Sequence, residues 1–445
     1  MSDAEEWMRS IGFEMVLAEV AAVKPVRSVG RVTELSRGVL TVSGLSGIVA
    51  LGDLVEIGHG TQVRLGEVLQ LDRTGVTILP DGGPDGLSIG DPVCHLGSNH
   101  IAPDETWIGR VIDPFGRPLD GRPILTGTRP RALRGTPLNP TARRPLGPRL
   151  ESGLAVFNTL LPIVRGQRVG LFAGSGVGKS TLLARLASGI DADIVVIALV
   201  GERGREVRDF VDRVLGPAGM TRTVIVAATS DQSPMVRRRC AWAAMSVAEH
   251  FRDRGRQVLF LADSVTRFAE AHREVALAMG EAGSLRGFPP STSHLITTLC
   301  ERAGPGLGEQ GDITAVFSVL VAGSDMEEPV ADILRGVLDG HVVLDRQIAE
   351  RGRFPAIDLL RSVSRALPQA ASEAENEMIV RARRLLGVFD RAEMMVQAGL
   401  YSRGTDPLID EAVETWPKLD AFLGHTEPED SASSFARLAS CFSTQ

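Results

Sequence analysis

The chain has 445 residues, of which 43% are hydrophobic and 23% are charged, and its formal net charge is −7. This length exceeds one ordinary core and predicts two or three domains, while the acidic balance and an aromatic content of only 4% argue against a nucleic-acid-binding surface. The four cysteines lack metal-ligand spacing, the amino terminus is acidic, and no apolar run approaches the roughly 18 residues of a membrane span. We therefore expect a cytoplasmic protein with reduced thiols.

The first two segments in chain order are a helix and a small barrel. Residues 4–20 carry apolar side chains at helical spacing, which predicts a helix that either docks a partner or packs on its own domain. The pattern then changes to short alternating runs punctuated by glycine, such as 30–35 and 39–42. Alternation of this kind predicts a small antiparallel β-barrel, so we assign residues 1–20 to the helix and 21–97 to the barrel domain.

The central domain is predicted over residues 98–368. Proline, glycine and arginine cluster between residues 122 and 150, which indicates an extended connector on a domain surface. Five apolar runs of strand length then alternate with helical stretches, and they cover residues 169–172, 194–200, 223–228, 258–262 and 313–319. This alternation predicts an α/β domain with a mostly parallel sheet, in which ligands bind beyond the carboxyl ends of the strands.

The last segment, residues 369–445, is predicted to be a helical end domain. Ile379, Ala382, Leu386 and Phe389 form one apolar stripe, and a second helix is expected near residues 408–415.

A glycine-rich turn follows the first central strand. Residues 173–181 read Ala-Gly-Ser-Gly-Val-Gly-Lys-Ser-Thr and lead into a helical run. Such a turn aims backbone N–H groups into one concavity, the helix N-terminus adds partial positive charge, and Lys179 supplies a mobile cation. We therefore predict a P-loop that binds a nucleoside triphosphate with Mg²⁺, with the Ser180 hydroxyl offered to the metal. The assigned binding residues are Gly174, Ser175, Gly176, Val177, Gly178, Lys179, Ser180 and Thr181. The alternative is a chance glycine turn that caps a helix, and Ala173 stands where the usual pattern has glycine.

Three further residues are candidates for hydrolysis. Asp263 ends an apolar strand, where it could hold Mg²⁺ through water, although aspartates are also common in loops after strands. Glu202 follows the strand over 194–200 and could polarise the attacking water if that strand neighbours the P-loop strand, or it could belong to a solvated charge run. Arg365 could act as an arginine finger or lie on the surface.

With these residues in place, the chain resembles the ATPases of flagellar and type III protein secretion, relatives of the catalytic subunits of rotary ATP synthases. The resemblance covers nearly the whole chain. The segments that carry it are the P-loop with Ala173 included and residues 201–207, 263–269, 287–291, 301–304, 339–341, 354–358 and 396–407. It implies a RecA-like P-loop core, preceded by a small β-barrel domain and followed by a helical end domain.

The resemblance also implies ATP hydrolysis with Mg²⁺ and a role for each candidate residue. Lys179 and Ser180 would bind phosphate and magnesium, Glu202 would activate water, Asp263 would orient the metal shell, and Arg203 would lie beside the phosphates. Phe354 stands where the family usually has a tyrosine against the adenine ring, and stacking survives the loss of the hydroxyl. Arg365 would reach the nucleotide of a neighbouring subunit, which implies a homohexameric ring.

The partners implied by the resemblance are those of an export machine. They are a stator-like regulatory protein at residues 1–20, a central stalk protein, export substrates with their chaperones, and an export gate at the inner face of the cytoplasmic membrane. No nucleic-acid partner is expected.

Four alternatives stay open beside flagellar export. Flagellar export is preferred over virulence-type secretion only on the overall likeness of the nucleotide and end domains. The end-domain motif argues against a rotary synthase catalytic subunit, and Glu202 argues against a non-hydrolysing nucleotide-binding ring subunit. The acidic balance and few aromatic residues argue against a ring-shaped RNA translocase.

Overall fold

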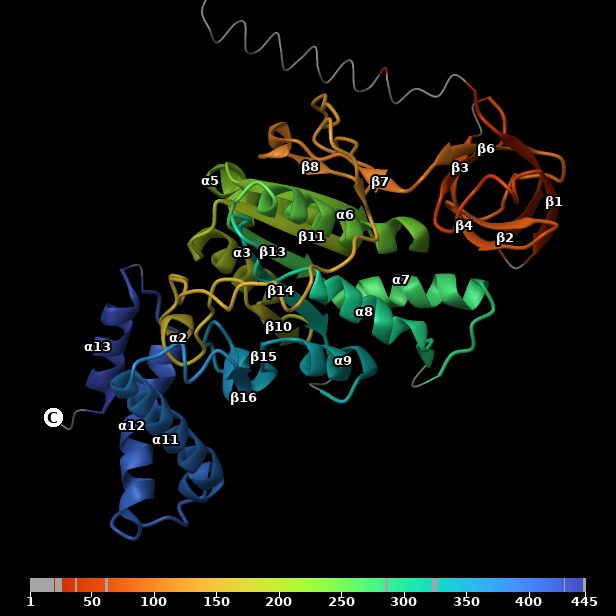
Figure 1. The fold of residues 1–445 in the computed structure, drawn as a ribbon. Helices are drawn as coiled ribbons and strands as arrows, with labels where there is room; N and C mark the ends of the chain where they lie inside the picture. Colours follow the sequence, from red (N-terminus) through yellow and green to blue (C-terminus); the bar gives the residue numbers. More distant parts are fainter. Residues whose placement is uncertain are drawn as a thin grey trace, which may run out of the picture.

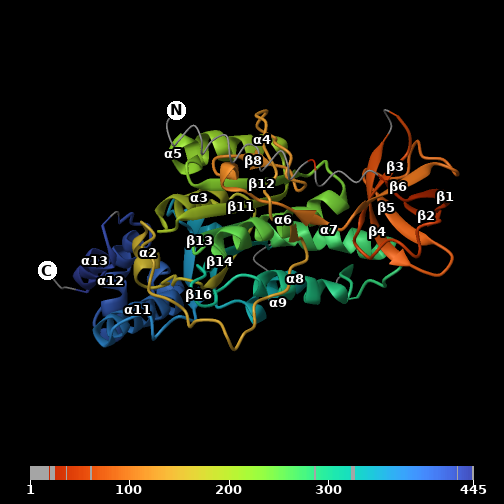
Figure 2. The ribbon, with the colours of Figure 1, turned by 45° about the horizontal axis from the view of Figure 1, so that its top comes forward.

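The structure is a computed structural model that describes residues 20, 26–36, 38–60, 63–284, 287–321, 326–427 and 429–442. Except for its last residue, the helix predicted over residues 4–20 lies outside this part. Figures 1 and 2 show a barrel and a helical domain at opposite ends of a central sheet domain. The predicted architecture is confirmed.

The amino-terminal unit is a closed antiparallel barrel in the order β1-β2-β5-β4-β3-β6. Its strands are β1 Val29–Ser36, β2 Val39–Ser43, β3 Leu54–Ile57, β4 Arg64–Leu71, β5 Val76–Pro80 and β6 Pro92–Gly97. Alternate residues such as Val32, Leu40 and Val42 fill its interior, as the period of two requires. Gly66 lies within β4, where a Cβ atom would come 2.8 Å from side-chain atoms of Ile57 and Ile78, so the interior has room only for hydrogen at this position.

The central unit is an eight-stranded sheet in the order β16-β15-β10-β14-β13-β11-β12-β8. Its strands are β8 Val111–Ile112, β10 Arg168–Ala173, β11 Ile194–Glu202, β12 Thr223–Thr229, β13 Val258–Asp263, β14 Ile313–Leu320, β15 Gly340–Leu344 and β16 Ile357–Ser364. The strands pair parallel except that β16 runs antiparallel to β15. All five predicted strands lie in this sheet. They could be predicted because strands that are buried on both faces read as continuous apolar runs.

Helices cover both faces of the sheet, and each face has its own apolar core. One core joins the sheet to α2 Ala155–Asn158, α3 Lys179–Gly189 and the π-helical turn η2 Phe210–Leu215. The other joins it to α6 Pro234–Arg252, α7 Val265–Ala278, α8 Ser291–Glu301 and α9 Pro329–Val337. The remaining short elements are β7 His100–Ile101, η1 Glu105–Trp107, β9 Arg131–Ala132, α4 Gly204–Asp209, α5 Gly216–Met220 and α10 Arg346–Glu350.

The carboxyl-terminal unit consists of α11 Glu373–Gln397, α12 Pro407–Leu423 and α13 Ser431–Cys441. The predicted stripe on α11 is buried at Ile379, Ala382 and Leu386, with Phe389 packed beside it. These helices share one continuous apolar core with the sheet, so the end domain packs directly against the central domain. None of the helices in the described residues is long and apolar enough to cross a membrane.

The connector over residues 122–150 is tied to all three units by arginines. Arg134 pairs with Glu67 of the barrel at 2.9 Å, Arg144 with Asp312 of the central domain at 2.6 Å, and Arg149 with Glu375 of α11 at 3.0 Å. This arrangement explains why arginine clusters with proline and glycine there: the extended backbone supplies reach and the guanidinium groups supply fixed donors.

The junction between barrel and central domain contains a buried ion pair. Glu67 on β4 and Arg238 on α6 are each 2% exposed, and their side chains are 2.8 Å apart. We expect Glu67→Gln to lower the free energy of unfolding by about 3 to 5 kcal/mol, because Arg238 would keep a buried charge without its counter-ion. Urea unfolding measures this. The control is Glu56→Gln in the exposed Arg27–Glu56 pair, for which we expect a loss below about 1 kcal/mol; equal losses in the two variants would contradict the prediction.

Candidate active site

A glycine-rich loop joins β10 to α3 and forms the floor of the site. Gly176 (φ 78°) and Gly178 (φ 88°) have left-handed backbone, which other residues rarely adopt. Val177 between them is 2% exposed, so its side chain belongs to the core and only its backbone is offered to a ligand. Gly178 is the N-cap of α3, and the free N–H groups of the first helical turn therefore face this loop, as anion binding requires.

Lys179 lies between two carboxylates. Its ammonium group forms an ion pair with Asp263 at the end of β13, and its Nζ lies 4.0 Å from Oε1 of Glu202 at the end of β11. Asp263 also accepts a hydrogen bond of 2.7 Å from the Ser318 hydroxyl of β14, which fixes the orientation of its carboxylate. The structure thus brings Lys179, Glu202 and Asp263 together, although they are far apart in the sequence.

The role considered for Glu202 was conditional on β11 neighbouring the P-loop strand β10. That condition is not met, because β14 and β13 lie between the two strands. Glu202 still comes close to Lys179 for two reasons. The pairing of β11 with β13 ends at Leu199 and Asp263, so β11 extends beyond the end of β13, and the long Lys179 side chain reaches past β14 toward that end.

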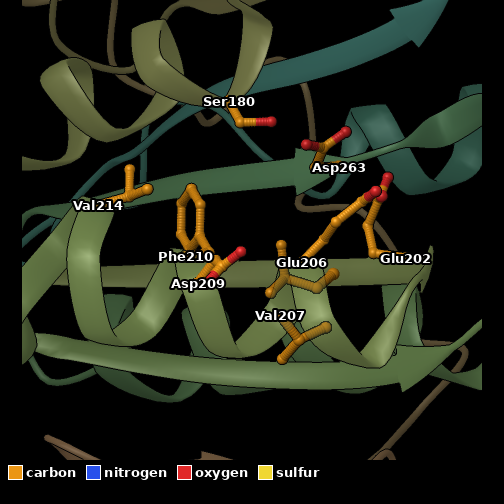
Figure 3. A pocket seen from close by; sticks show the side chains of 9 residues that line it. Ser180, Glu202, Glu206, Val207, Asp209, Phe210, Val214 and Asp263 are labelled. Carbon is orange, nitrogen blue, oxygen red and sulfur yellow. The ribbon is translucent and has the colours of Figure 1, made fainter.

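The electrostatics of Glu202 suit a general base near neutral pH. Burial, and after it the negative charge of Asp263, raise the pKa of Glu202 to about 7, although the Lys179 ammonium opposes both effects. Figure 3 shows the Glu202 and Glu206 carboxyl groups side by side, facing the same small pocket as Ser180 and Asp263. A carboxyl group with this pKa can take a proton at pH 7 and release it again.

The same pocket could hold Mg²⁺. It has a volume of about 160 Å³ and is lined by the Ser180 hydroxyl and the buried Asp263 carboxylate. Among the described residues, no three His, Cys, Asp or Glu side chains gather as a metal site. The polar side chains that line the pocket are carboxylates and a hydroxyl, and such oxygen donors fit an ion that keeps several waters and binds substrate phosphates.

A larger cleft of about 750 Å³ opens above the P-loop. All of the predicted loop residues except Val177 line it, together with Glu202 and Arg203. The Arg203 side chain is 81% exposed and lies 3.8 Å from Glu206, so it sits at the mouth rather than in the depth of the cleft.

Arg267 also lines this cleft, although no role was predicted for it from the sequence. It contacts the backbone position of Gly201, where a Cβ atom would lie 3.3 Å from the Arg267 Cβ, and it pairs with Glu270 at 2.9 Å. The signal that could have identified it is its place in the first turn of α7, four residues after Asp263.

Phe354 lies beside the P-loop, on the segment that precedes β16. A Cβ atom on Gly178 would be 3.4 Å from its ring, and the residue is 49% exposed. One part of the ring therefore contacts the loop while the rest is open to a planar ligand.

Arg365 lies near the strand ends that are remote from the P-loop. β16 begins at Ile357, which pairs with Leu344 at the carboxyl end of β15, on the P-loop side. It ends at Ser364, which pairs with Gly340 at the amino end of β15, on the far side. The strand separates Arg365 from Phe354 by roughly 20 Å, and the Arg365 guanidinium donates to the Arg335 carbonyl at 3.0 Å. The structure therefore does not bring Arg365 to the cleft of its own chain.

Comparisons with known proteins agree over most of the chain. The nucleotide-binding domain model of the ATP synthase alpha/beta family matches residues 153–364, and the model of the T3SS EscN ATPase C-terminal domain matches residues 371–440. A flagellum-specific ATP synthase of Salmonella typhimurium is 41% identical over 91% of each chain. A type 3 secretion system ATPase of Pseudomonas syringae pv. tomato is also 41% identical, over 91% of each chain.

Solved structures are similar as well. The assembled ATPase EscN from the type III secretion system of enteropathogenic E. coli matches with a TM-score of 0.86 and 33% identity, covering 93% of this chain and 100% of that chain. The same ATPase in complex with its central stalk EscO matches with a TM-score of 0.83 and 34% identity over the same shares of the two chains.

Proposed function

This chain belongs to the family of flagellar and type III secretion ATPases, which makes it an ATP-hydrolysing enzyme, and from that premise we propose that it energises protein export through a flagellar-type secretion apparatus. ATP hydrolysis would drive the release of export substrates from their chaperones and their unfolding. The observation that carries the proposal is the convergence of the Lys179, Glu202 and Asp263 side chains beside the P-loop. Such a site binds a triphosphate and activates water, which is the chemistry of hydrolysis.

Each residue of the cleft has a distinct role in this mechanism. The P-loop amides and Lys179 bind the β- and γ-phosphates, whose oxygens compete with Asp263 for the lysine ammonium. Glu202 orients the attacking water and accepts its proton. Ser180 and, through water, Asp263 would hold Mg²⁺, and the bound ion would neutralise charge on the phosphate oxygens. Arg203 lies at the mouth of the cleft, on the phosphate side.

Adenine stacking and a residue from the neighbouring subunit complete the proposed site. We assign Phe354 to stacking on adenine, because its ring is half-exposed next to Gly178. We assign Arg365 to the site of the adjacent subunit, because it lies at the far edge of its own sheet. One chain then carries both halves of a shared site, which supports a homohexameric ring.

The further partners follow from the same family. The solved complex of EscN with its central stalk EscO supports a stalk partner for this chain. A stator-like protein at residues 1–20, chaperone-bound substrates and an export gate complete the proposed assembly, in the cytoplasm at the inner face of the membrane. The match of residues 371–440 to the type III C-terminal model favours the secretion branch over a rotary synthase subunit.

The proposal is tested by export itself. In cells whose own copy is replaced by Glu202→Gln, we expect secretion of filament protein into the medium to fall to the level of cells that lack the gene. Immunoblots of the medium measure it, with cellular amounts of the variant as the control. Undiminished filament secretion would overturn flagellar export. If virulence effectors were lost from the medium instead, virulence-type secretion would be the correct assignment.

A further inference from the structure

The segment that carries Phe354 is held by its neighbour Arg353. The Arg353 guanidinium donates to the carbonyl of Pro355 at 2.9 Å and to the carbonyl of Ile357 at 2.8 Å. Its side chain is only 9% exposed, so these donors are committed to the protein. Arg353 therefore folds back on the backbone that directly follows Phe354.

The same guanidinium reaches into the end domain. Its Nε lies 2.9 Å from Oδ1 of Asp420 on α12. A second contact lies beside this ion pair, because a Cβ atom on Gly424, just after α12, would be 3.2 Å from the Phe354 carbonyl oxygen and 3.5 Å from the Arg353 Cγ. The end of α12 is thus packed against the backbone of the aromatic residue itself.

The opposite side of the segment contacts the phosphate loop. The Phe354 ring lies against Gly178, which caps α3 next to Lys179. Residue 356 leads directly into the sheet, since the Asp345 amide donates to the Ala356 carbonyl at 2.8 Å. The segment is consequently fixed at its sheet end, and the position of its aromatic end depends on Arg353 and α12.

We propose that Arg353 is a positioning residue for the nucleotide base, and that its ion pair with Asp420 makes the affinity for ATP depend on the position of the end domain. The inference rests on the proposed role of Phe354 in stacking. Because the pair acts on the base and not on the phosphates, it contributes to KM for ATP and leaves kcat and phosphate binding unchanged.

The test compares ATP with a ligand that has no base. We expect Arg353→Gln to raise KM for ATP by about 3- to 10-fold, as the loss of one or two hydrogen bonds would give. We expect Asp420→Asn to raise it by about 2- to 5-fold, as the loss of one ion pair would give. Inorganic tripolyphosphate, used as a competitive inhibitor, should keep its inhibition constant in both variants. The matched control is Arg351→Gln, because Arg351 also pairs with the end domain, with Glu393 of α11 at 3.5 Å, but does not hold the Phe354 segment; its KM should be unchanged.

A double substitution distinguishes the stacking role of Phe354 from the positioning role of Arg353. Phe354→Ala should raise KM for ATP, and adding Arg353→Gln to it should raise KM no further, because both act through the same ring. If Phe354→Ala raises KM while Arg353→Gln and Asp420→Asn do not, the role of Arg353 is wrong and stacking stands. If Phe354→Ala itself leaves KM unchanged, stacking is wrong and the inference falls with it. A parallel rise in the tripolyphosphate inhibition constant would mean general damage to the site and would also overturn the inference.

Discussion

ATP hydrolysis by Glu202→Gln is expected to be about 10²- to 10⁴-fold slower than by the wild-type chain, the usual contribution of a general base. Glutamine has the shape of glutamate but cannot accept the proton of the attacking water at neutral pH. The substitution also removes a negative charge near Asp263, so neither the stability of the fold nor phosphate binding by Lys179 should weaken. We therefore expect kcat to fall while calorimetry finds ATP affinity within a few-fold of the wild type.

The matched control is Glu274→Gln on α7. Glu274 pairs with Arg237 at 2.9 Å, and its side chain is 46% exposed, so it represents an ion pair outside the catalytic pocket and its loss should leave kcat unchanged. A Glu202→Gln enzyme with kcat within threefold of wild type, in contrast, would exclude Glu202 as the base.

The pH dependence of the wild-type enzyme gives a second measurement of the same group. The pKa of Glu202 is raised to about 7, chiefly by burial and then by the charge of Asp263. Only the ionised carboxylate can accept a proton, so kcat/KM should rise with pH, reach half its maximum near pH 7 and fall about tenfold per unit well below it. This acid limb should be absent in Glu202→Gln. An unchanged limb in that variant would assign the titration to another group.

Features that depend only on residues next to one another in the sequence could be predicted well. The P-loop over residues 173–181 combines a strand, a glycine turn and a helix start within one short segment, and the buried strands of the sheet each read as one apolar run. The apolar stripe of α11 likewise follows from its own spacing.

Features that depend on how strands are ordered could not be predicted in the same way. The sheet order separates β11 from β10, and Glu202 comes close to Lys179 because β11 extends past Asp263 and because the Lys179 side chain is long. Arg353 and Asp420 lie on different domains, and no local pattern around either residue indicates the other. The buried partner of Glu67 could not be predicted for the same reason, because Arg238 lies 171 residues away in the sequence and on another domain.

Arg365→Ala is expected to lower kcat by about 10³- to 10⁵-fold, the range typical of an arginine finger, although the residue is remote from the cleft of its own chain. The antiparallel course of β16 separates Phe354 and Arg365 to opposite edges of the sheet, so a planar cation at the far edge can stabilise transition-state charge only across an interface. The control Arg346→Ala, in an exposed pair with Glu350, should leave kcat unchanged.

Mixing two inactive chains decides whether the site is shared. Arg365→Ala chains keep Glu202, and Glu202→Gln chains keep Arg365, so random rings from equal amounts contain about a quarter of interfaces with both intact groups. We expect phosphate release to recover toward that fraction, whereas each variant alone stays inactive. Native mass spectrometry of differently tagged chains establishes that mixed rings have formed. Mixed rings without recovered activity would mean that Arg365 does not serve the neighbouring cleft, because an arginine acting across the interface must complement a base supplied by the other chain.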